Sequence, residues 1–525
     1  MLDKPAKGMR FRNKYRRILE IFPGFATWTT FGLITIFSFL APIIVASFII
    51  CYDLYWFLKA MHMMIHLVVS FRRMKENVKI DWLSKLDKIK NRNWHEVYHI
   101  IIFPFYKESF QILSTTFDAL IKTTYPKDKI IVVLASEERA GEGCYQKTAN
   151  KIKKRYGKYF FRMYHTIHPA DIVGEIKGKS ANATWAAREV KKEIDILKIP
   201  YKKIIISNLD SDTALHREYL AKVTYDFLKA KKPFQTSYQP IPVYNNNIWD
   251  APAIMRIVAT GSAFWHLIES SRRERLRTFS SHSMSFDTLV KVDYWRTDVV
   301  NEDSMIFWQC FFHFNGDYQV QPIFIPVSMD TCLAETYIQS FVNQYKQKRR
   351  WGYNVEYFPW LFINMIRKKK IPLWTRFIQT YRYVEGNYSW TTGVMIITFF
   401  GWFPLIFGDF TGFSRTTMAF TFPSVVRGAM TLALIGLLVQ SVISTLLLPK
   451  RPGGHSRLKY IFMVAQWVLQ PIAGVFFGAI PAIDAQTRLM LGKYMHFFVT
   501  SKARRNKEGK IVEGGSDSLT LTRSR

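Results

Sequence analysis

The sequence predicts an α/β domain inserted between N- and C-terminal transmembrane helices. Apolar runs almost free of charge lie near both ends of the chain, and between them short β-branched runs alternate with helical stretches. The chain has 525 residues, too many for one ordinary domain. Hydrophobic residues make up 49% and charged residues still 22%, a mixture that suits a soluble part joined to lipid-facing helices.

The formal net charge of +33 narrows the class of partner. Basic clusters flank the apolar runs, and none forms the block that is typical of a nucleic-acid-binding arm. We therefore expect membrane lipids and a phosphate-bearing substrate as partners, and no nucleic acid. The four cysteines show no CxxC spacing, so neither a zinc site nor a disulfide framework is expected.

The first apolar stretch, 25–71, follows a basic N-terminus at 1–24. A straight helix of that length would overshoot a hydrocarbon core of about 30 Å, and Pro42 interrupts it. We expect a hairpin of two spanning helices, at 25–41 and 44–70, with one long kinked helix as the alternative. Basic residues flank the stretch on both sides, which places both flanks in the cytoplasm.

A polar linker is predicted at 72–96, followed by a cytoplasmic domain at 97–352. Three apolar runs in this domain predict strands, at 97–106, 129–136 and 202–210. The stretch 179–194 predicts an intervening helix. Strands that alternate with helices indicate a parallel sheet.

Beyond the domain, residues 353–387 predict interfacial helices, since bulky aromatics there adjoin a cationic run. A helix in the core of the soluble domain is the alternative for this segment. The region 388–492 predicts C-terminal transmembrane helices and an interface helix. Its three apolar runs lie at 388–408, 424–448 and 458–480.

The number of Lys and Arg residues in each loop predicts which loops face the cytoplasm. The basic loop at 449–459 and the basic tail are both expected inside, so the last run must leave the membrane and return, with Pro471 at a tight hairpin. The total is then six spans, or five as the alternative, in the cell membrane with both termini cytoplasmic. Residues 506–525 predict a disordered tail.

Two acidic motifs carry the expected chemistry. Asp210 and Asp212 directly follow the strand KKIIISNL, where α/β sheets place ligands, and such a pair suits Mg²⁺ or Mn²⁺ on a diphosphate. Glu302 and Asp303 precede an apolar helical run, and a carboxylate there suits a general base. The alternative for the second motif is a helix start, with Asn301 as the N-cap.

Two further motifs carry cationic and aromatic groups. Residues 347–351 form a QxxRW pattern, in which an Arg can hold a phosphate and a Trp can stack on a sugar. Residues 497–502 form an FxVTxK pattern whose Thr and Lys suit a phosphate. An interfacial basic helix end and a juxtamembrane basic segment are the respective alternatives.

The four motifs, taken in this order between membrane segments, resemble those of membrane-bound family 2 glycosyltransferases. The likeness is to the catalytic subunit of bacterial cellulose synthase and related processive β-glycan synthases, and it covers about 97–505. It implies a GT-A-like nucleotide-sugar-binding domain. On the donor side it implies roles for Pro104, Glu108, Lys179 and Asn182. Glu137 stands where the family has an Asp pair that contacts the base.

The resemblance also assigns the reacting groups. Asp210 and Asp212 match the metal-diphosphate motif, and Asp303, beside Glu302, matches the catalytic base. His282 is an acceptor contact or a structural imidazole. The residues that match the acceptor-side QxxRW motif are Gln347, Arg350 and Trp351. Those that match a cytoplasmic gating loop, at 493–505, are Phe497, Val499, Thr500 and Lys502.

The function implied is inverting transfer from a nucleotide sugar, expected to be a UDP-sugar, to a growing β-glycan with coupled export. The alternative is a non-processive transferase with a membrane-lipid acceptor, which shares all but the last motif. A non-catalytic transporter or scaffold with a degenerate transferase domain is a third class, and the intact carboxylates disfavour it. The sequence does not show whether the chain has partner subunits.

Overall fold

The computed structural model describes residues 14–90, 93–453, 455–500, 503–505 and 511–513. It forms two compact units. The first holds 72–343 and the described residues from His496 onward, and the second holds 14–71 and 344–495. The start of the basic N-terminus, Lys502 and most of the predicted disordered tail lie outside the described residues.

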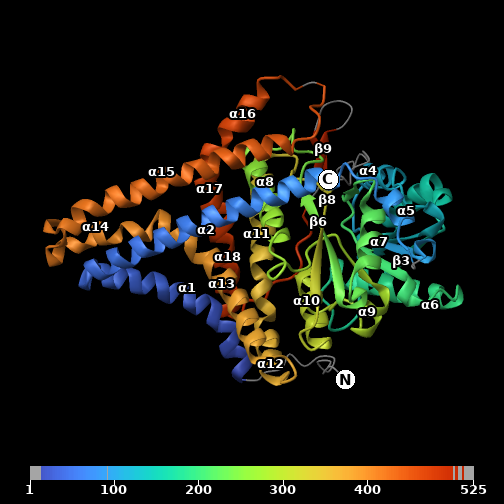
Figure 1. Ribbon diagram of the computed structural model, residues 1–525, viewed down its shortest axis with the longest axis horizontal. Helices are drawn as coiled ribbons and strands as arrows, with labels where there is room; N and C mark the ends of the chain where they lie inside the picture. Colours follow the sequence, from blue (N-terminus) through green and yellow to red (C-terminus); the bar gives the residue numbers. More distant parts are fainter. Residues whose placement is uncertain (1–13, 91–92, 454, 501–502, 506–510, 514–525) are drawn as a thin grey trace, which may run out of the picture. The chain divides into compact units, whose positions relative to one another are not determined.

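The first unit is built on one mixed sheet, which has eight strands among the described residues (Figure 1). Their order across the sheet is β3-β2-β1-β4-β7-β6-β8-β5. The strands are β1 Tyr98–Pro104, β2 Ile130–Glu137, β3 Arg162–His168, β4 Ile204–Asn208, β5 Ala214–Leu215, β6 Thr236–Val243, β7 His282–Ser285 and β8 Gln319–Ser328. The three strands predicted from sequence are confirmed as β1, β2 and β4.

The prediction of a wholly parallel sheet is corrected at β7. Strands β3, β2, β1 and β4 are parallel, but β7 is antiparallel to both β4 and β6, while β6 is parallel to β8. The sequence of β7 is HSMS, which has no apolar run to reveal a strand. Its side chains are nevertheless buried, and two of the polar ones have hydrogen-bond partners within the unit. Ser283 Oγ lies 2.7 Å from Ser207 Oγ, and His282 Nδ1 lies 3.0 Å from the Phe279 carbonyl.

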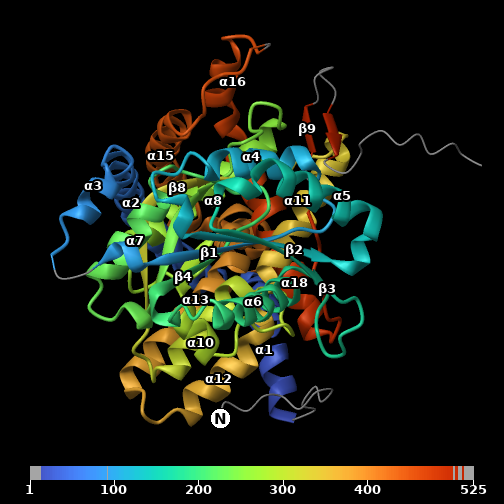
Figure 2. The same ribbon diagram turned by 90° about the vertical axis from the view of Figure 1, so that its right-hand side faces the viewer.

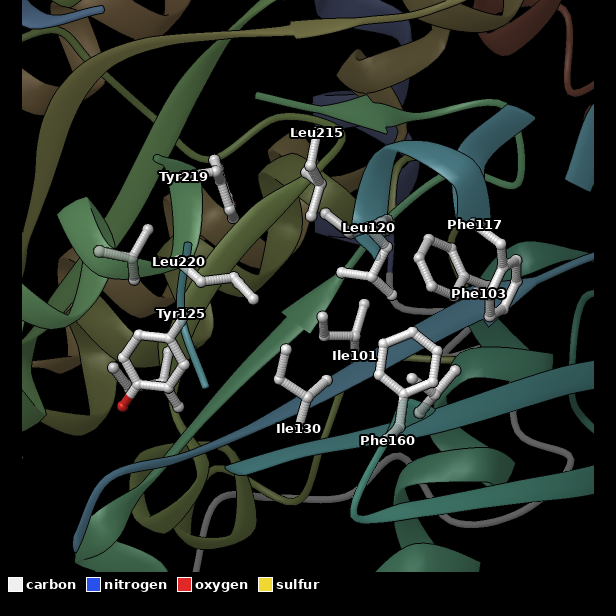
Figure 3. Close-up of a cluster of buried hydrophobic side chains, with 14 of the residues drawn as sticks. Ile101, Phe103, Phe117, Leu120, Tyr125, Ile130, Phe160, Leu215, Tyr219 and Leu220 are labelled. Carbon is white, nitrogen blue, oxygen red and sulfur yellow. The ribbon is translucent and has the colours of Figure 1, made fainter. Parts of the chain in front are cut away.

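The two faces of the sheet are covered by different helices. Ile101, Phe103 and Ile130 point into one hydrophobic cluster with side chains from α4 and α7 (Figure 3). Helix α6 packs against β1, β2 and β3 on the opposite face (Figure 2). The helices of this unit are α3 Trp82–Asp87, α4 Phe110–Leu120, α5 Glu142–Tyr156, α6 Lys179–Ile196, α7 Tyr219–Lys229, α8 Ala253–Ser270, α9 Phe286–Lys291 and α10 Glu302–His313. Helix coverage of both faces explains the continuous apolar runs of β1 and β2.

The segment expected as a polar linker, 72–96, instead packs onto this unit. Trp82 and Trp94 are buried in the hydrophobic cluster of the sheet. The backbone N–H of Trp82 donates to Glu218 Oε2 at 3.0 Å. Charged residues dominate the composition of the segment, but its few large apolar side chains decide where it lies.

The second unit is helical. Its helices are α1 Lys14–Leu40, α2 Pro42–Asn77, α12 Phe358–Arg367, α13 Leu373–Thr398, α14 Phe403–Phe407, α15 Thr417–Leu446, α16 Lys459–Ala465, α17 Gln470–Gly474 and α18 Ile480–Met490, and α11 Tyr337–Gly352 leads into it. The prediction of two N-terminal helices is confirmed, since α1 and α2 are separated at Ala41 and Pro42 starts the second (Figure 1). Both helices extend beyond the predicted bounds.

The predicted hairpin at Pro471 is wrong. Lys459–Met490 is one helical run of 32 residues, in which a 3₁₀ turn at Gln466–Leu469 and a π-helical turn at Val475–Ala479 replace a reversal. Pro471 lies in the first turn of α17, where its missing N–H breaks no helical hydrogen bond. The predicted interface helix is the last part of this run and ends at Met490.

Three helices among the described residues are long and apolar enough to cross a membrane, and a pair bent by 48°, Leu373–Thr398 with Phe400–Thr411, makes up to four. The number of membrane spans, expected as five or six, stays a prediction, since α15 adds a further apolar helix of 30 residues. Many large apolar side chains of this unit point outward, among them Ile44 at 67% and Phe410 at 85% exposure. A surface of this kind is stable against lipid and not against water.

Candidate active site

The DxD motif lies at the carboxyl end of β4. The backbone N–H of Leu209 still bonds to Ile102 of β1, so the chain leaves the sheet immediately before Asp210. The N–H of Thr213 then closes a turn onto the carbonyl of Asp210. Ligands bind at the carboxyl ends of strands in sheets of this kind, and the motif lies at such an end.

Lys179, the first residue of α6, lies at the centre of an acidic cluster. Its Nζ is 2.7 Å from Asp210 Oδ1, 2.9 Å from Asp303 Oδ2 and 3.7 Å from Glu302 Oε1. Asp303 belongs to the first turn of α10, so three elements converge on one ammonium. The structure therefore brings together the predicted metal motif, the predicted base and a predicted donor contact.

The charges of this cluster are unequal. Burial lowers the pKa of the Lys179 ammonium, but the attraction of the surrounding carboxylates outweighs it and the net pKa is raised above the usual value. Lys179 is thus charged throughout the physiological range. Three carboxylates around one ammonium leave an excess of negative charge, which suits a further cation.

The second aspartate of the motif is more deeply buried than the first. Asp212 is 3% exposed, and its Oδ2 accepts a hydrogen bond of 2.9 Å from the backbone N–H of Asp330. Asp210 Oδ2 accepts from Ser280 Oγ at 2.6 Å. Between them, Ser211 Oγ donates to Glu108 Oε1 at 2.9 Å, so the predicted donor residue Glu108 supports the motif directly.

These residues fit a divalent cation of the Mg²⁺ or Mn²⁺ type. The donor set is oxygen only, which such hard cations prefer. No cluster of three or more His, Cys, Asp or Glu side chains with metal-binding geometry occurs in the part of the chain that the structure describes. Mg²⁺ is ordinarily held by one or two carboxylates together with water and substrate phosphate, and Asp210 and Asp212 supply that number.

Glu137 and Pro104 end neighbouring strands on the same side of the sheet, and Pro104 pairs with Ala135 of β2. The Glu137 carboxylate is 4% exposed and forms an ion pair with Arg139. The Arg139 guanidinium stacks over the Tyr106 ring at 4.4 Å. Glu137 is therefore buried beside a cation that itself lies over an aromatic ring.

Two of the predicted site residues, Asn182 and His282, are buried and hydrogen-bonded within the fold. Asn182 is fully buried, and its Nδ2 donates to the Ala135 carbonyl at 2.8 Å, which ties α6 to β2. His282 is also fully buried; its Nδ1 lies 3.0 Å from the Phe279 carbonyl, and Trp295 Nε1 donates to its Nε2 at 3.2 Å. Burial lowers the pKa of the His282 imidazole, which these two partners hold in its neutral form. Since His282 Nδ1 also lies 3.7 Å from Asp303 Oδ1, the acceptor contact and the structural imidazole both stay predictions.

The remaining predicted residues lie elsewhere on the chain. Gln347, Arg350 and Trp351 occupy the last turns of α11, in the second unit, where Gln344 Nε2 donates to Gln347 Oε1 at 2.9 Å. Thr500 follows Phe497 in the first unit, and Lys502 lies outside the described residues.

Sequence reasoning missed several residues that shape this site. Ser280 holds Asp210, and Asp330 holds Asp212. Asp330 comes just after the apolar strand β8, which is the same signal that selected the DxD motif after β4. Arg139 and Tyr106 carried no comparable signal, because each follows a different strand end and they meet only in the fold.

No family model matches the chain, and no curated protein matches it. Among solved structures it is similar to the mannosyltransferase PcManGT from Pyrobaculum calidifontis in complex with GDP-Man and Mn²⁺, at 14% identity and a TM-score of 0.38, over 74% of this chain and 99% of that one. It is also similar to S. aureus TarS 1–349 in complex with UDP-GlcNAc, at 11% identity and a TM-score of 0.37, over 79% and 96% of the two chains. Scores of this size assign no function, which has to come from the residues of the site.

Proposed function

We propose that the protein is a membrane-embedded inverting glycosyltransferase of the family 2 type. It transfers a sugar from a nucleotide sugar, a UDP-sugar in the first instance, to a growing β-glycan. The observation that carries this proposal is the position of Lys179 within hydrogen-bonding distance of both Asp210 and Asp303. Asp210, proposed to bind the metal-diphosphate, and Asp303, the proposed base, thus both contact the same Lys179 ammonium.

That arrangement supports direct displacement at the anomeric carbon. Asp303 accepts the proton of the acceptor hydroxyl, whose oxygen bonds to the anomeric carbon as the bond to the diphosphate oxygen breaks. The configuration at the carbon inverts because the base and the leaving group lie on opposite sides of it. The Asp303 carboxylate now contacts Lys179 through both oxygens, so one contact is given up before it takes the proton.

The Lys179 ammonium is placed to neutralise the departing diphosphate, since it already bridges the two acidic groups. Asp210 and Asp212 are the residues that would hold Mg²⁺ or Mn²⁺, which adds positive charge at the leaving group. Arg350 and Lys502 are proposed as further phosphate contacts, and Gln347 with Trp351 as contacts of the acceptor end. Glu137 is proposed as the contact to the base.

The class of acceptor that we propose rests on the apolar helices of the second unit. Its apolar, outward-facing helices support a location in a membrane. We propose the cell membrane, with the first unit and both termini on the cytoplasmic side, where nucleotide sugars occur. A transferase anchored in this way can extend a glycan that leaves through the membrane. A membrane-lipid acceptor is the competing outcome of the test below.

The test is transfer of radiolabel by membranes that contain the full chain. UDP-glucose and UDP-N-acetylglucosamine are supplied with Mg²⁺ or Mn²⁺, and the product is sized and extracted into organic solvent. Asp303→Asn should lower transfer by at least ~10²-fold, the usual minimum for loss of a general base. Asp195→Asn is the matched control, because Asp195 is a half-exposed surface carboxylate bonded to Lys191 on α6.

High-molecular-weight product that disappears in Asp303→Asn supports the glycan synthase. Label confined to the organic extract replaces the glycan acceptor by a lipid. Equal transfer by wild type and Asp303→Asn would remove Asp303 from the mechanism.

A further inference from the structure

The chain returns to the first unit after its last helix and contacts it at Phe497 and again at Ala503. Phe497 lies against Gly178, where a Cβ atom would come within 2.7 Å of the Phe497 ring and the backbone φ is +155°. Six residues later, the backbone N–H of Ala503 donates to the Leu333 carbonyl at 3.1 Å. Since Gly178 precedes Lys179, the first contact adjoins the acidic cluster directly.

Arg504 makes the strongest attachment of this segment. Its Nη2 lies 2.7 Å from Asp330 Oδ1 and its Nε lies 3.1 Å from Asp330 Oδ2, while Nη1 donates to Thr115 Oγ1 at 2.6 Å. The two side chains of the ion pair are 14% and 2% exposed. A bidentate guanidinium–carboxylate pair of this kind fixes orientation as well as distance.

Asp330 in turn connects this ion pair to the DxD motif. Its backbone N–H is the donor to Asp212 Oδ2. Asn246 Nδ2 spans the same two residues, since it donates to the Asp212 carbonyl at 3.0 Å and to Asp330 Oδ1 at 2.9 Å. Any rotation of the Asp330 loop therefore moves the hydrogen bond that orients Asp212.

We propose that Arg504 is a positioning residue of the donor site. Through Asp330 it sets the orientation of Asp212. This inference rests on the proposed nucleotide-sugar site and adds a residue outside all four of its motifs. Lysine cannot replace Arg504, because an ammonium makes only one of the two parallel contacts with Asp330.

The experiment measures binding of UDP, with and without Mn²⁺, to the detergent-solubilised full chain by calorimetry, together with melting temperature. Arg504→Met should weaken Mn²⁺-dependent UDP binding at least tenfold, and Arg504→Lys should give an intermediate loss. Arg155→Met is the control: it removes the same charge from a side chain that is 57% exposed on the same unit, and binding should not change.

The double variant Arg504→Met/Asp330→Asn separates positioning from stability. It leaves no buried unpaired carboxylate and keeps the Asp330 backbone N–H, so the melting temperature should return while UDP binding stays weak. Recovery of both properties, or wild-type binding by Arg504→Met, would overturn the inference and leave the proposed function standing. Failure of the wild-type chain to bind UDP would instead overturn the UDP site, and the inference with it.

Discussion

At the scale of single residues, Lys179 links groups that are far apart in the chain. It bonds to Asp303 across 124 positions, and it joins that residue to the DxD aspartate. The ammonium occupies the region in which a divalent cation and a diphosphate would add charge. Under the proposed function, binding of the donor rearranges the Lys179 contacts and releases Asp303 as a base in the same step.

Removal of that ammonium gives a prediction with a worked-out pH dependence. In Lys179→Met, the carboxylates of Asp210, Glu302 and Asp303 lose their shared cation and repel one another. Protonation relieves this repulsion, so stability falls as pH rises. We expect a loss of about 3 kcal/mol at pH 7 and a smaller loss at pH 5, measured as melting temperature. Lys192→Met is the control, since Lys192 is 68% exposed beside Glu189.

The same variant reports on the cation site. Mn²⁺ supplies the missing positive charge, so it should raise the melting temperature of Lys179→Met more than that of the wild type. An equal response of both proteins would argue against a cation at Asp210.

At the scale of elements, the sequence predicted the strands and helices that carry their own run of apolar residues. Strands β1, β2 and β4 and helix α6 follow from runs of Ile, Val and Ala, and the DxD site follows from the end of a strand. Strand β7 was not predictable, because three of its four residues are polar and the strand is buried only by tertiary contacts. Pro471 was misinterpreted, since a proline in a first helical turn and one in a hairpin look alike in sequence.

An ion pair joins helices α2 and α13. The apolar pattern of the sequence did not predict it. Lys59 Nζ lies 2.5 Å from Glu385 Oε1, with the side chains 18% and 12% exposed, and Ser389 Oγ donates to the same oxygen at 2.9 Å. Charged groups on spanning helices are costly unless they are paired. We infer that this pair fixes the register of the two helices.

This inference gives a double-mutant prediction. Lys59→Met alone removes the ion pair with Glu385 and should destabilise the solubilised protein, whereas Lys59→Met/Glu385→Gln should recover most of the loss. The coupling free energy from thermal unfolding should lie in the range of about 0.5–3 kcal/mol. Additive effects of the two changes would show that the pair does not matter, and exposed Lys450→Met serves as the reference for lost charge.

At the scale of the whole molecule, chain connectivity restricts the number of spans. The second unit is entered at 344 and left at 495, and both neighbouring segments belong to the compact first unit. A compact soluble unit lies on one side of a membrane, so an even number of crossings must lie between these points. The region offers the bent pair at 373–411, helix α15 and the run Lys459–Met490.

We predict that the bent pair and α15 cross the membrane and that Lys459–Met490 does not. This run is interrupted by 3₁₀ and π-helical turns, and its end is polar, where Asp484 pairs with Arg349 and Arg488. Arg17, at the start of α1, donates to the Leu489 carbonyl, so the run ends beside the basic start of the first helix. Both of its ends then lie on the cytoplasmic side, and the chain has four spans.

Labelling with a membrane-impermeant maleimide in sealed vesicles of known orientation tests this topology. Ser414→Cys, between the bent pair and α15, should react from outside. Ser456→Cys and Lys493→Cys, at the two ends of the last run, should react only after permeabilisation, as should Lys158→Cys in the first unit. Labelling of Ser456→Cys and Lys493→Cys from opposite sides would make that run a true span, and parity would then require either the bent pair or α15 to return without crossing.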